Sequence, residues 1–470
     1  MKFLFRADAS TEIGSGHLMR CLTLANALRK LGAKSVFMCD AIDDVLRNRV
    51  TQSGFSVTSK VSELFDYLVV DQYSLDHEFE NKMHVFCKRV VVIDDLANRK
   101  HMADYLLDQN VNASAERYKT LVPERCVQLL GTRYALLQPE YSMIIKRERT
   151  SMIKKIFVYF GNADRDNFTS RAIDAYLTLR RPDISLEIVP SGVHQEMVRK
   201  LAKKGRNIHI HENLTSLASL MNECDLAIGA GGATSYERCA MGLFSIVVAI
   251  ADNQRGLSEE LDRRGLIRYL GYRDRVDTDH ITRALQEIVR AGVKTEIIPK
   301  MRALVDGFGA QRVAEILMLS ENTELSAREV AETDEKWLFD LENEKCVRDN
   351  MQRLSAIDPN EYHKWFTGWL SDRSFTRFYV IKAALAVGFV RFERVGNEWQ
   401  ISFALSNYAR SRGIGKKAFG LALKTFVNQL GNVPLSAKVL PSNAAACKVF
   451  DGLRFVKARG EDGSVIYLDR

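Results

Sequence analysis

Short apolar runs that alternate with helical stretches constrain the fold of this chain more than any other feature. In the first 148 residues such runs lie at 2–5, 35–40, 67–73, 89–97 and 105–113, and several end in charged or polar residues. Near-continuous apolar runs are typical of parallel strands buried on both faces, and parallel strands need crossover connections. Residues 1–148 are therefore predicted to form a doubly wound, Rossmann-like α/β half.

The same alternation begins again after a charged linker at 146–155. Apolar runs start at 156, 186, 207, 225 and 245, and a last helix is expected over 302–317. A chain of 470 residues exceeds one ordinary core, so several domains are expected. Residues 149–322 are predicted to form a second Rossmann-like half.

The alternation stops near residues 322–328. Helical patterns follow at 332–350 and 361–370, then a hairpin at 377–395 and a strand at 399–405 that leads into an amphipathic helix. Residues 323–470 are therefore expected to form a third domain of the α+β class.

Composition narrows the functional classes. The net charge of +8 is dispersed, without a basic block that would favour nucleic acid, and a small phosphate-bearing substrate explains it equally well. The eight cysteines include no C-x-x-C pair, which is typical of reduced thiols. The longest apolar run, 244–251, is too short to cross a bilayer, and Arg6 and Asp8 argue against a signal peptide. We expect a cytoplasmic protein that binds neither nucleic acid nor membranes; its oligomeric state is open.

The first glycine-rich turn lies between the first strand and the first helix. Glycine lets the backbone approach a bound group closely, and the helix start presents free amides to an anion. His17 stands at this positive helix end, which disfavours its imidazolium form and leaves a base that accepts a proton. Arg20 shares a face with His17 and is suited to a phosphate oxygen. The expected substrate loop comprises Asp8, Gly14, Ser15, Gly16 and Arg20. The alternative is an ordinary βα turn in which the histidine caps or packs.

Polar residues at the ends of the first-half strands indicate a crevice. Asp8, Tyr73, Asp94 and Asp95 all follow apolar runs, and ligands bind at the carboxyl ends of such strands. For the two neighbouring aspartates, helix capping or turn formation is an equally open interpretation.

A second glycine-rich turn, in the second half, favours a nucleotide. It offers amides and two hydroxyls to a diphosphate, Glu237 is placed to accept both ribose hydroxyls, and two neutral amides follow the next strand. The expected nucleotide site comprises Gly231, Gly232, Ala233, Thr234, Ser235, Glu237, Asn253 and Gln254. A packing turn is the alternative. His209 and His211 share a strand face, and a solvated strand is preferred to a metal site because no carboxylate or cysteine stands at ligand spacing. No metal is expected.

The third glycine-rich turn, in the last domain, carries arginines. Residues 410–415 read RSRGIG between a strand and an amphipathic helix, an arrangement that presents amides and positive charge to a pyrophosphate. A solvated turn is the alternative.

Residues 1–320 contain the motifs RADASxxIGSGHLMRCLTLA, VVIDDL, NVNA, GTRYALLQPEY and AGGATSYERCAMG. With these motifs the region resembles the UDP-2,4-diacetamido-2,4,6-trideoxy-β-L-altropyranose hydrolases of pseudaminic acid synthesis. The resemblance implies a GT-B fold and inverting hydrolysis of a nucleotide sugar with release of UDP. His17 would activate the water, and the second turn with Asn253 and Gln254 would bind UDP. Asn162 and Ala163 depart from the Gly-Gly-Thr/Ser of relatives, which weakens a phosphate role for that loop.

Residues 325–470 resemble GNAT acetyltransferases that act on amino sugars. The match is the R-x-x-G-x-G turn, Asn443 and CKVFDGLRF. The resemblance implies acetyl-CoA as co-substrate, bound by Phe403, Ala404, Leu405, Arg410, Ser411, Arg412, Gly413, Ile414, Gly415, Lys416 and Asn443. Phe450 stands where many relatives have a tyrosine that protonates the leaving thiolate. The general acid is therefore unassigned, with Tyr408 and Tyr467 as candidates.

The two resemblances together predict a bifunctional enzyme. The acetyltransferase would acetylate the 4-amino group of UDP-4-amino-4,6-dideoxy-N-acetyl-β-L-altrosamine, and the GT-B region would hydrolyse the product. The alternatives are a UDP-sugar glycosyltransferase fused to an acyltransferase, and a C-terminal domain that only binds CoA.

Overall fold

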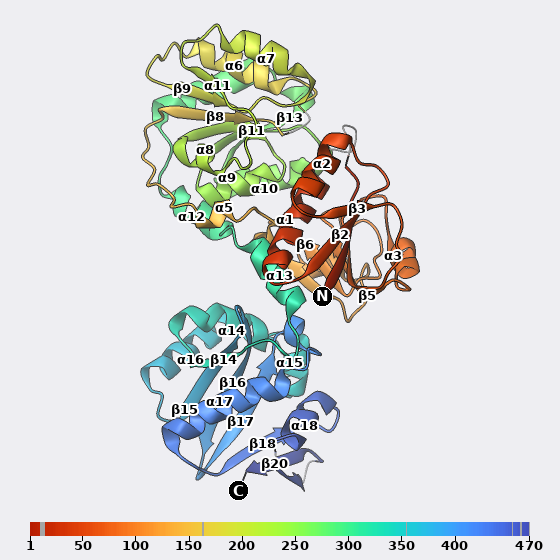
Figure 1. Ribbon diagram of the computed structural model, residues 1–470. Helices are drawn as coiled ribbons and strands as arrows, with labels where there is room; N and C mark the ends of the chain where they lie inside the picture. Colours follow the sequence, from red (N-terminus) through yellow and green to blue (C-terminus); the bar gives the residue numbers. More distant parts are fainter. Residues whose placement is uncertain (10–14, 162–163, 354, 454, 461–462, 470) are drawn as a thin grey trace. The chain divides into compact units, whose positions relative to one another are not determined.

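The computed structural model describes residues 1–9, 15–161, 164–353, 355–453, 455–460 and 463–469. The chain divides into two compact units, Met1–Ala314 and Glu315–Arg470, whose folds are shown in Figure 1. The predicted turn residue Gly14 and the departing pair Asn162 and Ala163 lie outside the described residues.

The first sheet of the first unit has seven strands in the order β3-β2-β1-β4-β5-β6-β7, and every pair of neighbours is parallel. The strands are β1 (Lys2–Arg6), β2 (Lys34–Met38), β3 (Ser56–Thr58), β4 (Phe65–Val70), β5 (Cys87–Ile93), β6 (Tyr105–Asp108) and β7 (Val127–Leu130). The connecting helices include α1 (Gly16–Lys30), α2 (Asp44–Gln52) and α3 (His77–Met83). The doubly wound parallel sheet predicted from the apolar runs is therefore present.

The second sheet has six parallel strands in the order β10-β9-β8-β11-β12-β13. They are β8 (Lys155–Tyr159), β9 (Ser185–Ile188), β10 (Ile208–Ile210), β11 (Leu226–Ala230), β12 (Ser245–Ala249) and β13 (Arg268–Tyr272). Figure 1 shows one face covered by α6 (Phe168–Thr178), α7 (Gln195–Ala202) and α11 (Thr278–Ala291), and the other by α8 (Ala218–Glu223), α9 (Thr234–Met241) and α10 (Arg255–Arg263).

Both faces of the second sheet are buried, which explains its uninterrupted apolar runs. Ile156 and Val158 join the core cluster of one face, whereas Phe157 between them joins the cluster of the other. Side chains alternate along a strand, so a strand covered by helices on both faces is apolar at most of its positions.

The strand orders fix where a ligand site is expected in each half. In the first sheet β1 lies between β2 and β4, so the loops that leave β1 and β4 run to opposite sides of the sheet. In the second sheet β8 and β11 have the same relation. Ligands of open parallel sheets bind at such switch points, outside the carboxyl ends of the strands.

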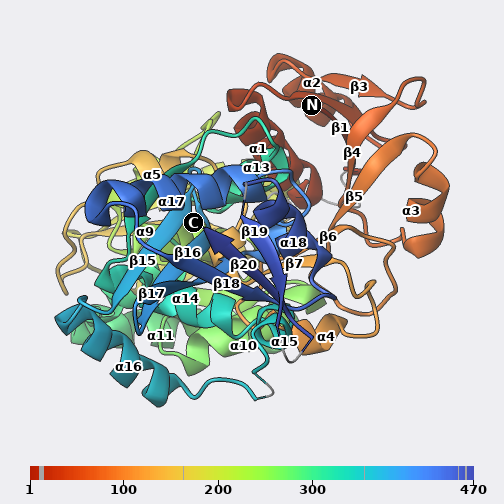
Figure 2. The same ribbon diagram turned by 90° about the horizontal axis from the view of Figure 1, so that it is seen from below.

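The second unit holds one mixed sheet in the order β14-β15-β16-β17-β18-β20-β19. Its strands are β14 (Ser326–Glu329), β15 (Thr376–Lys382), β16 (Ala386–Val395), β17 (Glu398–Leu405), β18 (Leu435–Val439), β19 (Val456–Arg459) and β20 (Val465–Asp469). One core cluster joins the sheet to α17 (Gly415–Leu430) and another joins it to α14 (Glu335–Glu342) and α16 (Pro359–Ser371). The unit is of the predicted α+β class, and Figure 2 shows it from below.

The strands β17 and β18 are parallel neighbours over a short stretch. Their pairs are Trp399 with Leu435 and Gln400 with Ser436, and no further pair joins them among the described residues. β17 nevertheless pairs along its other edge with β16 as far as Leu405. The sheet therefore opens between the carboxyl-terminal parts of β17 and β18.

The helix expected over 302–317 is in fact two helices. α12 (Ile297–Leu304) ends before Gly307, and α13 (Gly309–Met318) begins after it. Gly307 has φ of +85°, a conformation that favours glycine, and a Cβ on Gly309 would lie 2.2 Å from the carbonyl oxygen of Ala135. The sequence has helical periodicity over this range, but the helix is interrupted at Gly307 and packs closely on the backbone at Gly309. No described helix has the length and apolarity needed to span a bilayer.

Candidate active sites

An ion-pair cluster occupies the switch point of the first sheet. His17 stands in the first turn of α1, and its Nδ1 lies 2.6 Å from Oδ1 of Asp71, which directly follows β4. Arg20, one turn further along α1, donates from Nε to Oδ2 at 2.5 Å and from a terminal nitrogen to Oδ1 at 2.6 Å. The start of α1 and the end of β4 thus bring together a base, a carboxylate and a cation.

The Asp71 carboxylate favours one tautomer of His17, although a terminal nitrogen of Arg20 also lies 3.2 Å from Nδ1. Burial by itself raises the pKa of the Asp71 carboxyl, but the charges and hydrogen bonds of Arg20 and His17 hold that pKa well below its usual range. A carboxylate only accepts hydrogen bonds, so the proton of the neutral imidazole lies on Nδ1. Nε2 is then the acceptor, and the side chain of His17 remains 12% exposed. The arrangement suits His17 to remove a proton from a bound molecule.

Tyr73 and Asp95 extend the cluster towards the second half. Arg20 donates to Oδ2 of Asp95 at 3.1 Å, and the Tyr73 hydroxyl donates to Oδ1 of Asp95 at 2.8 Å. The Tyr73 ring meets His17 edge to face with centroids 4.5 Å apart. Asn253 Nδ2 donates to the Tyr73 hydroxyl at 3.3 Å, which joins this cluster to a residue of the predicted nucleotide site.

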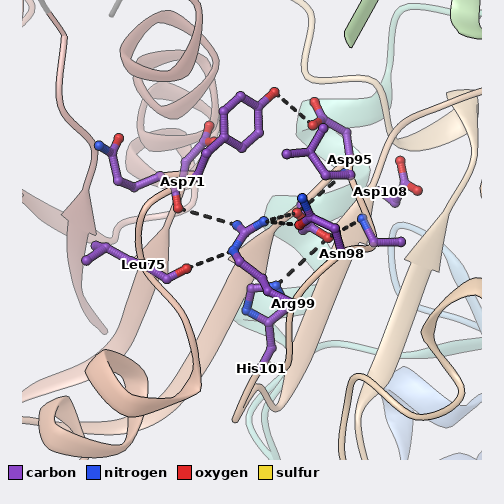
Figure 3. Close-up of polar contacts among 12 residues, drawn as sticks. Asp71, Leu75, Asp95, Asn98, Arg99, His101 and Asp108 are labelled. Atoms are coloured by element: carbon purple, nitrogen blue, oxygen red, sulfur yellow. Dashed lines mark hydrogen bonds and ion pairs between the residues drawn. The ribbon is translucent and has the colours of Figure 1, made fainter. Parts of the chain in front are cut away.

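Asp94 and Asp95 have different surroundings, although they are neighbours in the sequence. Asp94 is fully buried and accepts from the Ala97 amide at 2.9 Å and from Arg99 at 2.7 Å. Arg99 also donates to the Leu75 carbonyl at 2.8 Å, as Figure 3 shows. Asp94 therefore stabilises the turn after β5, which was one of the two alternatives for it. Asp95 instead joins the His17 cluster through Arg20.

The other described residues of the predicted substrate loop differ in burial and in their contacts with the rest of the protein. The buried carboxylate of Asp8 pairs with Arg6 at 2.5 Å and accepts from the amides of Asp40 and Ala41 at 2.8 and 3.1 Å. Ser15 is buried just before α1, whereas Gly16 has open space where a Cβ would stand. A substrate contact by Asp8 or Ser15 stays a prediction.

The second glycine-rich turn leaves β11 and opens α9, at the switch point of the second sheet. A Cβ on Gly231 would lie 2.2 Å from Oγ of Ser258, so this position has no room for a side chain. A Cβ on Gly232 would lie 3.3 Å from Nε2 of Gln254. Ala233 is exposed and Ser235 is buried, and the hydroxyls of Thr234 and Ser235 both accept hydrogen bonds from the Arg238 guanidinium, at 3.3 and 2.9 Å.

Glu237 has an unusual environment in the first turns of α9. Burial raises the pKa of its carboxyl to about 7, and a hydrogen bond with Tyr141 lowers it by less. Its Oε2 is buried without a hydrogen-bond partner among the described residues. Of the two amides predicted to join this site, Asn253 contacts Tyr73, and Gln254 accepts the Ile250 amide at 3.0 Å.

The third turn precedes α17, a helix of 16 residues that begins at Gly415 just after Ile414. Ser411 and Gly413 both have positive φ, of 56° and 77°. Arg410 donates to the Leu405 carbonyl at 2.9 Å and pairs with Glu344, and Arg412 is buried and donates to the Ile316 carbonyl at 3.4 Å. The arginines thus hold the turn in shape, while Lys416 is exposed at the start of the helix.

The other predicted residues of the last domain lie around the opening between β17 and β18. Phe403, Ala404 and Leu405 form the end of β17 beside that opening. Asn443 caps α18 (Ala444–Asp451) by accepting the Ala446 amide at 3.1 Å.

The two candidate acids of the last domain have their hydroxyls in hydrogen bonds within the protein. The Tyr408 hydroxyl donates to the Ala386 carbonyl at 2.6 Å, and that of Tyr467, a buried residue stacked on Phe450, donates to Asp451 at 2.9 Å.

The sequence did not single out Asp71 and Arg238. Asp71 follows an apolar run, the same signal that marked Asp8 and Asp95. Nothing in the sequence marks Arg238, because an arginine inside a short helix is ordinarily exposed.

A carboxylate does accompany His209 and His211, contrary to the reason given for preferring a solvated strand. Glu187 of β9 lies 3.0 Å from His209 Nδ1 and 2.7 Å from His211 Nε2, because the parallel register places it beside β10. Within the described part of the chain, no group of three or more histidine, cysteine, aspartate or glutamate residues is arranged to hold a metal ion.

Different known proteins match different regions of this chain. The family model described as acetyltransferase (GNAT) domain matches residues 324–456. An uncharacterised protein of Methanocaldococcus jannaschii is 22% identical over 99% of both chains. The UDP-2,4-diacetamido-2,4,6-trideoxy-β-L-altropyranose hydrolase of Campylobacter jejuni is 27% identical over 56% of this chain and 97% of its own.

A solved structure confirms the predicted fold of the larger region. The crystal structure of MurG from Acinetobacter baumannii, a GT-B glycosyltransferase, matches 67% of this chain and 98% of its own with a TM-score of 0.50 and 13% identity. At that identity the match establishes the fold alone. The chain therefore joins a GT-B region that resembles the UDP-2,4-diacetamido-2,4,6-trideoxy-β-L-altropyranose hydrolase to a C-terminal GNAT acetyltransferase domain.

Proposed function

We propose that the chain is a bifunctional enzyme that acts twice on one UDP-amino sugar. The GNAT domain transfers an acetyl group to the 4-amino group of UDP-4-amino-4,6-dideoxy-N-acetyl-β-L-altrosamine. The GT-B region then hydrolyses the product, UDP-2,4-diacetamido-2,4,6-trideoxy-β-L-altropyranose, to the free sugar and UDP. The fusion supports this proposal because the named relative of the larger region is a hydrolase of that nucleotide sugar.

The contact between His17 and Asp71 is the observation that carries the hydrolase proposal. A carboxylate 2.6 Å from Nδ1 holds the ring in place and stabilises the imidazolium that forms when Nε2 takes a proton. In the proposed step the water oxygen attacks C1 of the sugar from the face opposite UDP and its proton passes to Nε2. The bond from C1 to the phosphate oxygen breaks, and its electron pair leaves with UDP. Attack from the opposite face inverts the anomeric centre.

The turn at 231–235 and Glu237 are proposed to bind UDP. Gly231 lets the turn pack closely against Ser258, and the amides at the start of α9 are available to a diphosphate. The buried, unpartnered Oε2 of Glu237 is suited to accept a ribose hydroxyl. The hydrogen bond between Asn253 and Tyr73 supports a UDP site next to the His17 cluster.

The opening between β17 and β18 supports acetyl-CoA as the co-substrate. Beyond Gln400 the edge of β17 that faces β18 has no strand partner among the described residues, so its backbone is available to the pantetheine arm. The amides at the start of α17 are available to the pyrophosphate. In the transfer the amine nitrogen attacks the thioester carbon, and the carbon–sulfur bond breaks with its electron pair on sulfur. The proton that nitrogen loses balances the one that sulfur gains, so CoA leaves as a thiol.

The test supplies purified full-length protein with the amino-sugar nucleotide and acetyl-CoA, and follows free CoA, UDP and the mass of the sugar product. We expect both CoA and UDP to appear. His17→Ala should stop UDP release while CoA release continues, and Lys416→Glu, which places a negative charge at the start of α17, should weaken CoA release. Lys424→Glu, an exposed charge reversal further along the same helix, is the control and should change neither.

The results separate this proposal from its rivals. UDP release only after addition of a sugar acceptor would make the larger region a glycosyltransferase. Binding of acetyl-CoA without acetyl transfer to any UDP-amino sugar would reduce the last domain to a CoA-binding module. Failure to release either product would reject the bifunctional enzyme.

A further inference from the structure

Arg238 is a buried cation beneath the second glycine-rich turn. Its side chain is 1% exposed, and its terminal nitrogens donate to the Ala230 carbonyl at 2.7 Å, to Ser235 Oγ at 2.9 Å and to Thr234 Oγ1 at 3.3 Å. All three acceptors belong to the turn or to its entry. The guanidinium therefore holds the turn in shape from its buried side.

The charge of Arg238 has no counter-ion within the described residues. No carboxylate oxygen there lies within 4.0 Å of its guanidinium, whereas the part-buried Arg20 has two carboxylates and the buried Arg391 has Glu342. Burial of an unpaired charge is costly, so buried arginines normally have such partners.

The neighbouring Glu237 is a weak substitute for that counter-ion. Burial raises the pKa of the Glu237 carboxyl to about 7, so near neutral pH it carries only part of a negative charge. Burial also lowers the pKa of Arg238, but only to about 10, so the guanidinium remains charged at neutral pH. The turn therefore lies above a full positive charge that the protein leaves largely uncompensated.

We propose that Arg238 is a positioning residue whose charge is balanced by the diphosphate of the nucleotide, so that it makes the turn selective for a diphosphate over a monophosphate or a nucleoside. This inference rests on the proposed UDP site. Because the guanidinium occupies an oxygen lone pair of Thr234 and Ser235, it also directs their hydroxyl hydrogens away from itself. The hydroxyl hydrogen of Thr234, which is half-buried, is then available to a phosphate oxygen, whereas that of the buried Ser235 stays within the turn.

The experiment measures the affinities of full-length protein for UDP, UMP and uridine by calorimetry at one ionic strength. The wild type should bind UDP most tightly. Arg238→Met should lose about tenfold or more in affinity for UDP, less for UMP and little for uridine, because the lost attraction depends on ligand charge. Arg238→Lys, which keeps the charge, should regain much of the preference for UDP.

Arg149 provides a matched control. Burial also lowers its pKa to about 10, but it donates to the carbonyls of Met221, Cys224 and Met241, at the opposite end of β11 from the turn. Arg149→Met should leave the ratio of the three affinities unchanged, even if it reduces stability.

Each outcome is decisive. Equal losses for the three ligands in Arg238→Met would overturn the charge role and leave the UDP site intact. If Arg238→Met does not fold, the charged Arg238→Lys is compared with the uncharged Arg238→Gln for the same three ligands. An equal preference for UDP in these two variants would overturn the charge role of Arg238. A wild type that binds no UDP would overturn the proposed site, and this role with it.

Discussion

The two halves of the GT-B region share a doubly wound sheet, but they distribute charge differently at their switch points. In the first half Arg20 contacts the carboxylates of Asp71 and Asp95, so the cluster around His17 is compensated within the protein. In the second half Arg238 lies beneath a glycine-rich turn with no carboxylate within 4.0 Å among the described residues. The first cluster contains its own counter-ions, whereas the described residues around Arg238 contain none.

This difference suits the two halves to different tasks, proton transfer in the first and anion binding in the second. A compensated cluster holds an imidazole in a fixed orientation and tautomer, which suits proton transfer. An uncompensated buried charge under backbone amides attracts an anion, which suits the binding of a leaving diphosphate. The same topology therefore supports two kinds of site, because the site depends on a few side chains at the strand ends.

The largest expected effect comes from breaking the compensated cluster. Asp71→Asn removes the carboxylate that stabilises the imidazolium of His17, so UDP release should fall by about 10²–10⁴-fold while UDP affinity changes much less. A coupled assay for UDP and a calorimetric titration measure the two quantities. Asp40→Asn, which alters a more exposed partner of Arg6, is the control. UDP release within a fewfold of the wild type would refute the assigned role of Asp71.

An intermediate effect is expected on stability, because alanine substitution should destabilise the second glycine-rich turn more than the first. Gly231→Ala places a Cβ 2.2 Å from Ser258 Oγ, and such overpacking costs about 1–3 kcal/mol, so the midpoint of thermal unfolding should fall. Gly16→Ala meets no atom within 4 Å and should change the stability of the folded protein by less than about 0.5 kcal/mol. Addition of Ser258→Ala to Gly231→Ala removes the clashing oxygen and should restore part of the loss. Equal behaviour of the two single variants would contradict the close packing of the second turn.

The smallest effect concerns pH and Glu237. The folded-state pKa of about 7 lies above the ordinary value of 4.5, so this carboxyl contributes stability at low pH that is lost as pH rises from 4.5 to about 7. Glu237→Gln cannot titrate and should flatten the pH dependence of thermal unfolding over that window. Uridine should bind the wild type more tightly as the carboxyl ionises, and the variant should lose that rise. An unchanged pH profile in the variant would show that another group titrates there.

The sequence predicted more of the fold than of the site contacts. Apolar runs placed both parallel sheets, and the glycine-rich turns marked the strand ends where polar side chains gather. The sequence did not decide between Asp94 and Asp95, because the backbone path after β5 directs one to Arg99 and the other to Arg20. It also missed the carboxylate beside His209 and His211, since Glu187 reaches them only through the register of neighbouring strands.

By itself the sequence determined the fold class and the places where a base and an anion-binding turn were expected, because strand and helix periodicity and glycine-rich turns are local properties. Only the tertiary structure decided which side chains meet. His17 and Asp71 are 54 residues apart in the chain, and they meet because β4 lies beside β1. The burial of Arg238 without a counter-ion likewise depends on all the elements that pack around it, so no local sequence pattern could have predicted it.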